Sequence, residues 1–185
     1  VVEHDAARLA AITRGAEMGR AIADGVVIAR DLVNMPPNVA TPTRMADVAR
    51  AIAAARGLGV TVGDRDWAAQ RNMGAYLAVA KGAGEPPQFV VLEHNAERAD
   101  LPTVVLVGKG ITFDTGGITL KPGENMGSMK SDMGGAAAVL GAMEIIGKLK
   151  PNIRVTGLVV TAENSTDADA MRPGDIIVYR NGKSV

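Results

Sequence analysis

One glycine-rich segment, residues 104–135, gathers charged residues of which some could together hold a divalent cation. The charged residues are Lys109, Asp114, Lys121, Glu124, Lys130 and Asp132. Carboxylate oxygens are the ligands that hard divalent cations prefer. A lysine amine can join them only after it has lost its proton, a loss that a nearby dication promotes. Two aspartates and a neutral amine therefore predict a metal site in this segment.

Each of these residues also has an ordinary structural explanation. Lys109 and Lys121 fit the exposed lysines of a loop. Asp114 precedes a Thr-Gly-Gly turn, and Asp132 stands where a helix N-cap is expected. These explanations do not account for a stretch of roughly 25 irregular residues so rich in glycine and charge, because loops of that length are usually functional.

The candidate ligands need a scaffold, and the pattern of the chain predicts an α/β fold. Helices and strands alternate, which is typical of a mixed, largely parallel central sheet flanked by helices. The apolar run at 103–107 further predicts a strand buried on both faces. The expected helices cover about 5–34, 42–56, 65–72 and 133–149, with Thr41 and Asp64 as N-caps, and the expected strands cover 60–62, 88–94, 103–107 and 153–161.

Composition removes several classes of function. The chain has 185 residues and no cysteine, which excludes disulfides, thiolate nucleophiles and Cys-ligated zinc. His4 and His94 are its only histidines, so a His-rich metal site is excluded. A net charge of zero and 3% aromatic residues disfavour nucleic acid. Neither a membrane span nor a signal peptide is evident, so we expect a cytoplasmic location.

The last residues allow two interpretations. Residues 176–180 read as a strand, and Asn181-Gly182 is a strong hairpin signal. Either this is a small terminal hairpin on a complete domain, or the chain stops within a larger domain.

Several segments resemble the leucyl aminopeptidase (cytosol aminopeptidase) family of two-metal exopeptidases. The Lys-x4-Asp-x6-Lys-x10-Asp spacing is highly specific to that family. The matching stretches are VGKGITFDTGGITLKP from 107, NMGSMKSDMGGAAAV from 125, AENSTDADAMRPGD from 162, DLVNMPPN at 31–38 and YLAVAKGA at 76–83.

The resemblance implies a role for each candidate residue. Lys109 resembles the amine ligand of one metal, Asp114 the carboxylate that bridges both ions, and Asp132 a further ligand of the Lys109 metal. Lys121 matches the catalytic lysine, which is not a ligand and would polarise the scissile carbonyl of a bound substrate. Met129 matches a residue that lines the pocket for the first side chain of the substrate and favours apolar residues such as leucine.

The resemblance also implies cofactors, partners and domains. The family uses two divalent cations, zinc or manganese, cleaves peptides and forms hexamers, and its catalytic domain has a zinc-exopeptidase-like fold. Residues 1–34 then correspond to a linker and the first helix, and 35–185 to the N-terminal portion of the catalytic domain, incomplete at the C-terminus. The family's next motif supplies the remaining ligands, including the second bridging carboxylate. We therefore expect a metal-dependent aminopeptidase in the parent protein and little or no activity in residues 1–185 alone.

Two other classes of function fit the same residues. A binding or structural module could keep the fold without catalysis. A different hydrolase, such as a phosphatase, could use a carboxylate–Mg²⁺ site.

Overall fold

A four-stranded sheet carries the segment with the candidate ligands. The computed structural model describes residues 4–185. Its strands lie in the order β1-β2-β4-β3, where β1 pairs with β2 and β2 with β4 antiparallel, and β3 runs parallel to β4. The mixed α/β sheet is confirmed, but its parallel part is the β3–β4 pair. The strands are β1 (Gly59–Gly63), β2 (Gln88–His94), β3 (Thr103–Asp114) and β4 (Arg154–Asn164).

Two of the helices begin where their capping residues predict. Thr41 Oγ1 accepts a hydrogen bond from the Arg44 amide at the start of α2, and the Asp64 carboxylate accepts one from the Trp67 amide at the start of α3. The first helix is one unbroken rod despite its three glycines. The helices are α1 (Ala6–Asn34), α2 (Pro42–Arg56), α3 (Arg65–Ala69), α4 (Gly74–Val79) and α5 (Gly134–Leu149), with short 3₁₀ helices η1 (Ala80–Gly82) and η2 (Met126–Ser131).

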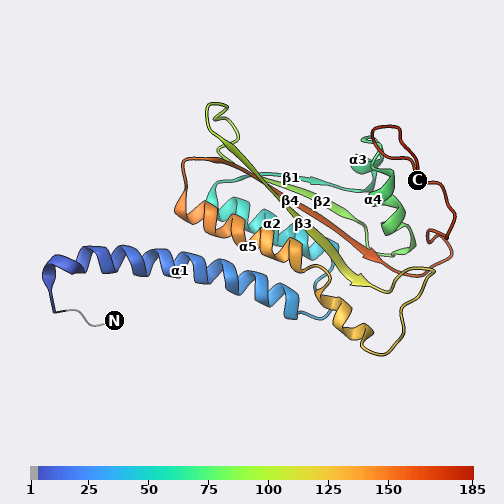
Figure 1. Ribbon diagram of the computed structural model, residues 1–185, viewed down its shortest axis with the longest axis horizontal. Coiled ribbons are helices and arrows are strands. Elements are labelled where there is room, and N and C mark those ends of the chain that lie inside the picture. The colour runs from blue at the N-terminus through green and yellow to red at the C-terminus, as the bar shows by residue number, and fades with distance from the viewer. Residues whose placement is uncertain (1–3) are drawn as a thin grey trace.

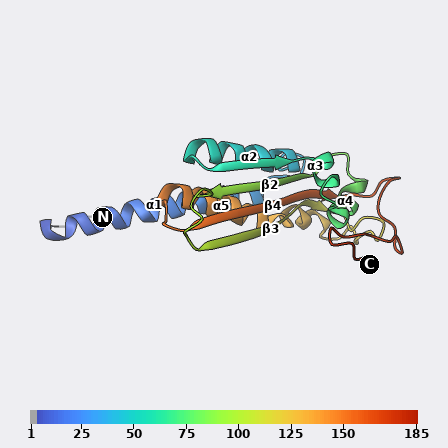
Figure 2. The same ribbon diagram turned by 90° about the horizontal axis from the view of Figure 1, so that it is seen from above.

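The three long helices are layered on one face of the sheet. Helices α2 and α5 cover that face, and α1 lies on the far side of α5 (Figure 1). The core lies between the sheet and these two helices and includes Val90, Leu92, Leu140, Met143 and Val159. The N-terminal part of α1 extends past the rest of the fold (Figure 2). No helix of residues 4–185 is long and apolar enough to cross a membrane.

Four expectations about individual elements are wrong. Strand β3 is an edge strand, and Val105 and Val107 are 53% and 69% exposed, so this strand is not buried on both faces. It also continues to Asp114, well beyond the expected end at 107. Helix α3 ends at Ala69, before the expected residue 72. Residues 176–180 form no strand: the turn closes through paired bonds between Ile177 and Val185 and one isolated bridge.

Two glycines allow α1 and α5 to touch along their backbones. A Cβ atom on Gly25 would lie 2.4 Å from the Gly141 carbonyl oxygen, and one on Gly141 would lie 2.4 Å from the Gly25 carbonyl oxygen. Because both obstacles are backbone atoms, no side-chain movement can relieve the contact. The crossing of α1 over α5 therefore requires glycine at both positions.

A charged network ties three helices together beside this crossing. The Glu144 carboxylate of α5 is 4% exposed and accepts two hydrogen bonds from the Arg56 guanidinium of α2, at 2.7 and 3.0 Å. Lys148 Nζ lies 3.1 Å from Glu144 and also contacts Asp24 of α1. Hydrogen bonds from Arg56 outweigh the opposing effect of burial and, with help from Lys148, hold the pKa of Glu144 below its usual value.

This network gives stability a predictable dependence on pH. Because the pKa of Glu144 is lowered in the folded state, its contribution is complete above the ordinary glutamate pKa and is lost as the pH falls through the folded-state value. We expect Glu144→Gln to lower the free energy of unfolding by about 2 kcal/mol at pH 7, in line with hydrogen bonds to charged groups. The difference from the unsubstituted chain should shrink as the pH is lowered. Urea denaturation along a pH series measures both effects.

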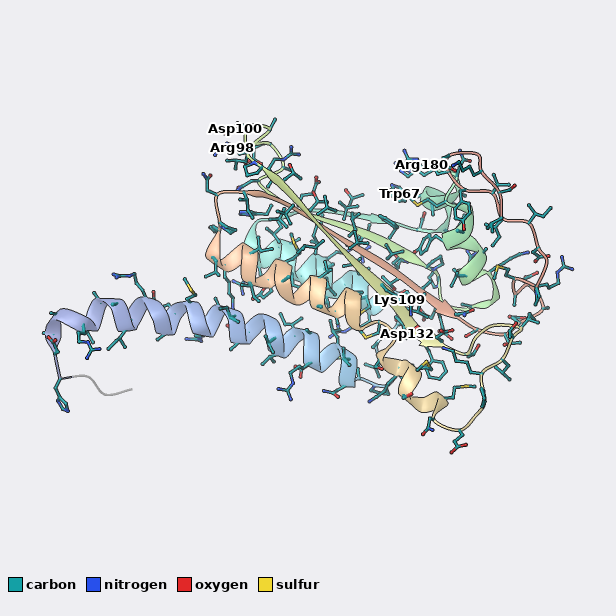
Figure 3. All side chains as sticks on the ribbon, in the orientation of Figure 1. Trp67, Arg98, Asp100, Lys109, Asp132 and Arg180 are labelled. Atoms are coloured by element: carbon teal, nitrogen blue, oxygen red, sulfur yellow. The ribbon has the colours of Figure 1, made fainter. Side chains whose placement is uncertain are left out.

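An exposed ion pair provides the matched control. Arg98 and Asp100 form a similar two-bond pair in the loop between β2 and β3, where their side chains are 46% and 63% exposed (Figure 3). Asp100→Asn should leave the free energy of unfolding almost unchanged, because solvent screens an exposed ion pair. An effect of Glu144→Gln that stayed constant from pH 7 to pH 3 would contradict the assignment.

Candidate metal site

A bulge in β3 brings Lys109 and Asp114 to the same face of the sheet. The two residues are five apart in the chain, and in a regular strand they would point to opposite faces. Lys109 is paired with Val160 and Asp114 with Asn164, which are four apart on β4, because the register shifts between Ile111 and Asp114. The extra residue restores the alternation. Both chemical groups are thereby carried toward the carboxyl end of β3, where ligands of open α/β sheets bind.

The two oxygens of the Asp114 carboxylate have different partners. Oδ1 accepts hydrogen bonds from the Gly116 amide at 2.9 Å and from Asn164 Nδ2 at 2.7 Å. Oδ2 lies 2.6 Å from the ammonium of Lys121. Oδ1 is therefore held by two donors of fixed position, whereas Oδ2 faces the ammonium of a flexible lysine side chain.

These donors determine the charge of Asp114. Burial by itself would raise the pKa of this carboxyl, but the hydrogen bonds from Lys121, Gly116 and Asn164 together hold the pKa below its usual value. Asp114 is therefore ionised at neutral pH, as a metal ligand must be.

A second pair is formed by Lys109 and Asp132. Lys109 Nζ contacts Asp132 Oδ2 and lies 3.4 Å from the Asp132 carbonyl oxygen. The two side chains meet between the C-terminal half of β3 and the start of α5 (Figure 3). Asp132 Oδ2 is shielded from solvent and accepts no conventional hydrogen bond from the described residues, although it touches this amine.

The short helix η2 connects the two pairs. Lys121 Nζ lies 3.1 Å from the Met129 sulfur, and the Asp132 amide donates to the Met129 carbonyl at 3.2 Å. Met129 therefore contacts the lysine of the first pair through its side chain and the aspartate of the second through its backbone. The four predicted residues and Met129 form one connected network.

The chemistry of this donor set fits a divalent cation. Asp114 provides an ionised carboxylate whose Oδ2 is directed away from the two fixed donors. Asp132 provides a shielded carboxylate oxygen, and the Lys109 amine lies beside it. Carboxylates and nitrogen ligands suit zinc and manganese alike. Histidine, cysteine, aspartate and glutamate do not gather in groups of three at any point of residues 4–185, so such a site depends on its lysine donor.

The ordinary explanations hold only in part. The Asp114 carboxylate does bond the amide two residues on, as a turn former would. Asp132 is not the N-cap of α5, since that position is taken by Met133 without a side-chain bond. Lys109 is 59% exposed but lies in a strand and not in a loop.

Asn164 also belongs to this site, although the sequence assigned it no role. It ends β4, the parallel neighbour of β3, so the two carboxyl ends meet at one edge of the sheet. Its position is the signal that could have identified it, because Asn164 is an amide residue at the end of the strand next to the one that carries Asp114.

A mostly apolar cavity of about 250 Å³ adjoins Asn164 and the Gly116-Gly117 turn. Ala78, Val79 and Met171 contribute to its wall. Met129 is not among its lining residues and contacts Lys121 instead.

Comparison with known proteins gives consistent matches over most of the chain. Residues 27–185 match the cytosol aminopeptidase family, catalytic domain. The probable cytosol aminopeptidase of Alkaliphilus oremlandii (strain OhILAs) is 47% identical over 174 residues, covering 94% of this chain and 35% of that protein. The corresponding protein of Cupriavidus taiwanensis is 45% identical over 185 residues, covering all of this chain and 36% of that protein. The chain thus spans about a third of the length of these curated relatives.

Solved structures give the same result. The bottromycin maturation enzyme BotP in complex with Mn superimposes with a TM-score of 0.87 at 39% identity, covering 93% of this chain and 37% of that one. A tomato leucine aminopeptidase mutant has a TM-score of 0.84 at 39% identity, covering 94% and 33%.

Proposed function

The chain belongs to the cytosol aminopeptidase family, and from this we propose that it supplies part of the metal site of a metal-dependent aminopeptidase. The observation that carries the proposal is the connected network of Lys109, Asp132, Met129, Lys121 and Asp114 at the carboxyl end of β3. A purely structural fold has no need of two lysine–aspartate pairs joined in this way.

Three residues of the network are proposed as metal ligands. Lys109 and Asp132 would hold one ion, and Asp114 would bridge it to a second. When bound, the two ions would supply a water nucleophile at neutral pH and polarise the peptide carbonyl. Zinc and manganese are both compatible with the donors, and a manganese-bound relative supports a divalent cation.

Lys121 has a different task from Lys109. Its ammonium already lies beside the Asp114 carboxylate, and Met129 supports its side chain. From there the ammonium would donate to the substrate carbonyl oxygen and stabilise the negative charge that develops on it. The substrates are proposed to be peptides with a free amino terminus and an apolar first residue, with Met129 beside that residue.

Some features of the proposal concern the whole protein. The three ligands proposed among the described residues are too few for a two-ion site, so the remaining ligands are proposed to come from elsewhere in the protein. A homohexamer and a cytoplasmic location, the latter suggested by the names of the relatives, complete the proposal.

Hydrolysis assays test this function. With Mn²⁺ or Zn²⁺, the full-length protein should cleave a leucyl amide and leave a phosphate monoester intact, whereas residues 1–185 alone should show a rate close to background. Cleavage of the phosphate ester in place of the amide would indicate a phosphatase. A leucyl amide rate of the 185-residue chain near that of the full-length protein would contradict the proposed shortage of ligands.

A further inference from the structure

We propose that Asn164 is a positioning residue that fixes the rotation of the Asp114 carboxylate so that Oδ2 is presented to a cation. The inference rests on the proposed function, because it assigns to Asn164 a role in the same metal site.

The hydrogen bonds at Asp114 give its two carboxylate oxygens different roles: Oδ1 is held by the protein, and Oδ2 remains for ligand binding. Asn164 Nδ2 and the Gly116 amide donate to Oδ1 from two directions, at 2.7 and 2.9 Å. A carboxylate oxygen with two such donors has little capacity left for a cation. Oδ2 contacts Lys121, whose ammonium is on a long flexible side chain. Rotation of the carboxylate out of this orientation would break both bonds to Oδ1, so Asn164 and Gly116 together keep one carboxylate oxygen facing the site.

Asn164 is itself held in place through its backbone. Its carbonyl oxygen accepts hydrogen bonds from the Thr115 amide and the Thr115 hydroxyl, both at 2.9 Å. Its backbone is paired with Asp114 in the β3–β4 ladder. These bonds do not involve the side-chain amide. Loss of the side chain therefore leaves the ends of β3 and β4 joined, and its effect should fall on the carboxylate.

The adjacent turn leaves room for the amide. Gly117 has φ +71°, and a Cβ atom there would lie 3.1 Å from Asn164 Oδ1. The Thr166 hydroxyl donates to the Gly117 carbonyl at 2.7 Å and keeps the turn against the end of β4. Glycine at 117 thus serves both the left-handed backbone and the space that the Asn164 side chain occupies.

A positioning role and a merely structural role of Asn164 predict different effects on metal affinity when the side chain is removed. Partners that orient a metal ligand typically change metal affinity 10–100-fold when removed. A neutral amide suits this role because it donates to Oδ1 without adding a second charge beside Oδ2. A merely structural asparagine would affect unfolding and leave the affinity unchanged.

Calorimetric titration of the full-length protein with Mn²⁺ tests the inference. We expect Asn164→Ala to weaken binding about 10–100-fold. The visible absorption spectrum of bound Co²⁺, which reports ligand geometry, should change in the same variant. Asn164→Leu, which keeps a side chain branched at the same atom but has no donor, should behave in the same way if the alanine variant folds poorly.

Asn95 provides a matched control at the other end of β2. Its Nδ2 donates to the carbonyl oxygens of Ile153 and Pro151, at 2.9 and 3.3 Å, with no carboxylate involved. Asn95→Ala should lower the thermal unfolding midpoint and leave Mn²⁺ affinity and the Co²⁺ spectrum unchanged. If the Asn164 variants bind Mn²⁺ within twofold of the unsubstituted protein, the positioning role is wrong. If the unsubstituted full-length protein binds neither cation, the proposed metal site itself is wrong, a result distinct from the failure of the positioning role alone.

Discussion

Replacing Asp114 by alanine is expected to abolish the binding of Mn²⁺ and Zn²⁺ to the 185-residue chain. Asp114 is the only proposed ligand with one oxygen held by two fixed donors and the other directed away from them. Its hydrogen bonds keep it ionised, so it offers full negative charge to a cation without first losing a proton. Calorimetric titration should give a binding isotherm for the unsubstituted chain and only heats of dilution for the variant.

One further variant separates charge from shape at this position, and a second variant elsewhere serves as a control. Asp114→Asn keeps the size of the side chain and removes its charge, so its binding should be weakened nearly as much as that of Asp114→Ala. Asp47→Ala removes an aspartate that pairs with Arg50 on the surface of α2, and it should leave the isotherm intact. A normal isotherm for Asp114→Ala would show that the cation is held by other residues, and the metal site proposed here would be incorrect.

The fold could be predicted from the sequence where local signals determine it. Thr41 and Asp64 are N-caps as expected, because capping depends on residues close in the chain. The position of β3 at the edge of the sheet depends on which strands pair, and the apolar run at 103–107 does not encode this. Val105 and Val107 read as buried for that reason, although they are exposed.

In the candidate site, too, the sequence indicated the residue types but not their arrangement in space. The spacing of lysines and aspartates identified the four charged residues, and the structure brings them together in two pairs. The bulge between Ile111 and Asp114 could not be foreseen, since it depends on pairing with β4. Without it Lys109 and Asp114 would face opposite sides. Asn164 was missed because its contribution is a contact between the ends of two strands that are far apart in the chain.

Lys121 and Lys109 should give opposite results when replaced by alanine. Lys121 Nζ lies 2.6 Å from Asp114 Oδ2, where a positive charge competes with a cation for the same oxygen. Lys121→Ala should therefore leave Mn²⁺ binding unchanged or make it tighter. Lys109→Ala removes the proposed metal ligand that lies beside Asp132 and should weaken Mn²⁺ binding. Weaker binding in both variants would show that Lys121 is a ligand too and would contradict its catalytic assignment.

In the full-length protein, Lys121→Ala is expected to reduce kcat for a leucyl amide by a factor of about 10²–10³, as is typical when one donor to a developing oxyanion is removed. Because the ammonium contributes most when the carbonyl oxygen becomes negative, the loss should appear mainly in kcat and less in KM. Lys121→Arg keeps the charge but places a wider, planar group beside Met129, so it should restore only part of the rate. Steady-state kinetics at saturating Mn²⁺, with metal content measured in each variant, distinguishes loss of catalysis from loss of metal. A kcat of Lys121→Ala within a few fold of the unsubstituted protein would mean that the oxyanion is stabilised by the ions alone, and that Lys121 serves only to balance the charge of Asp114.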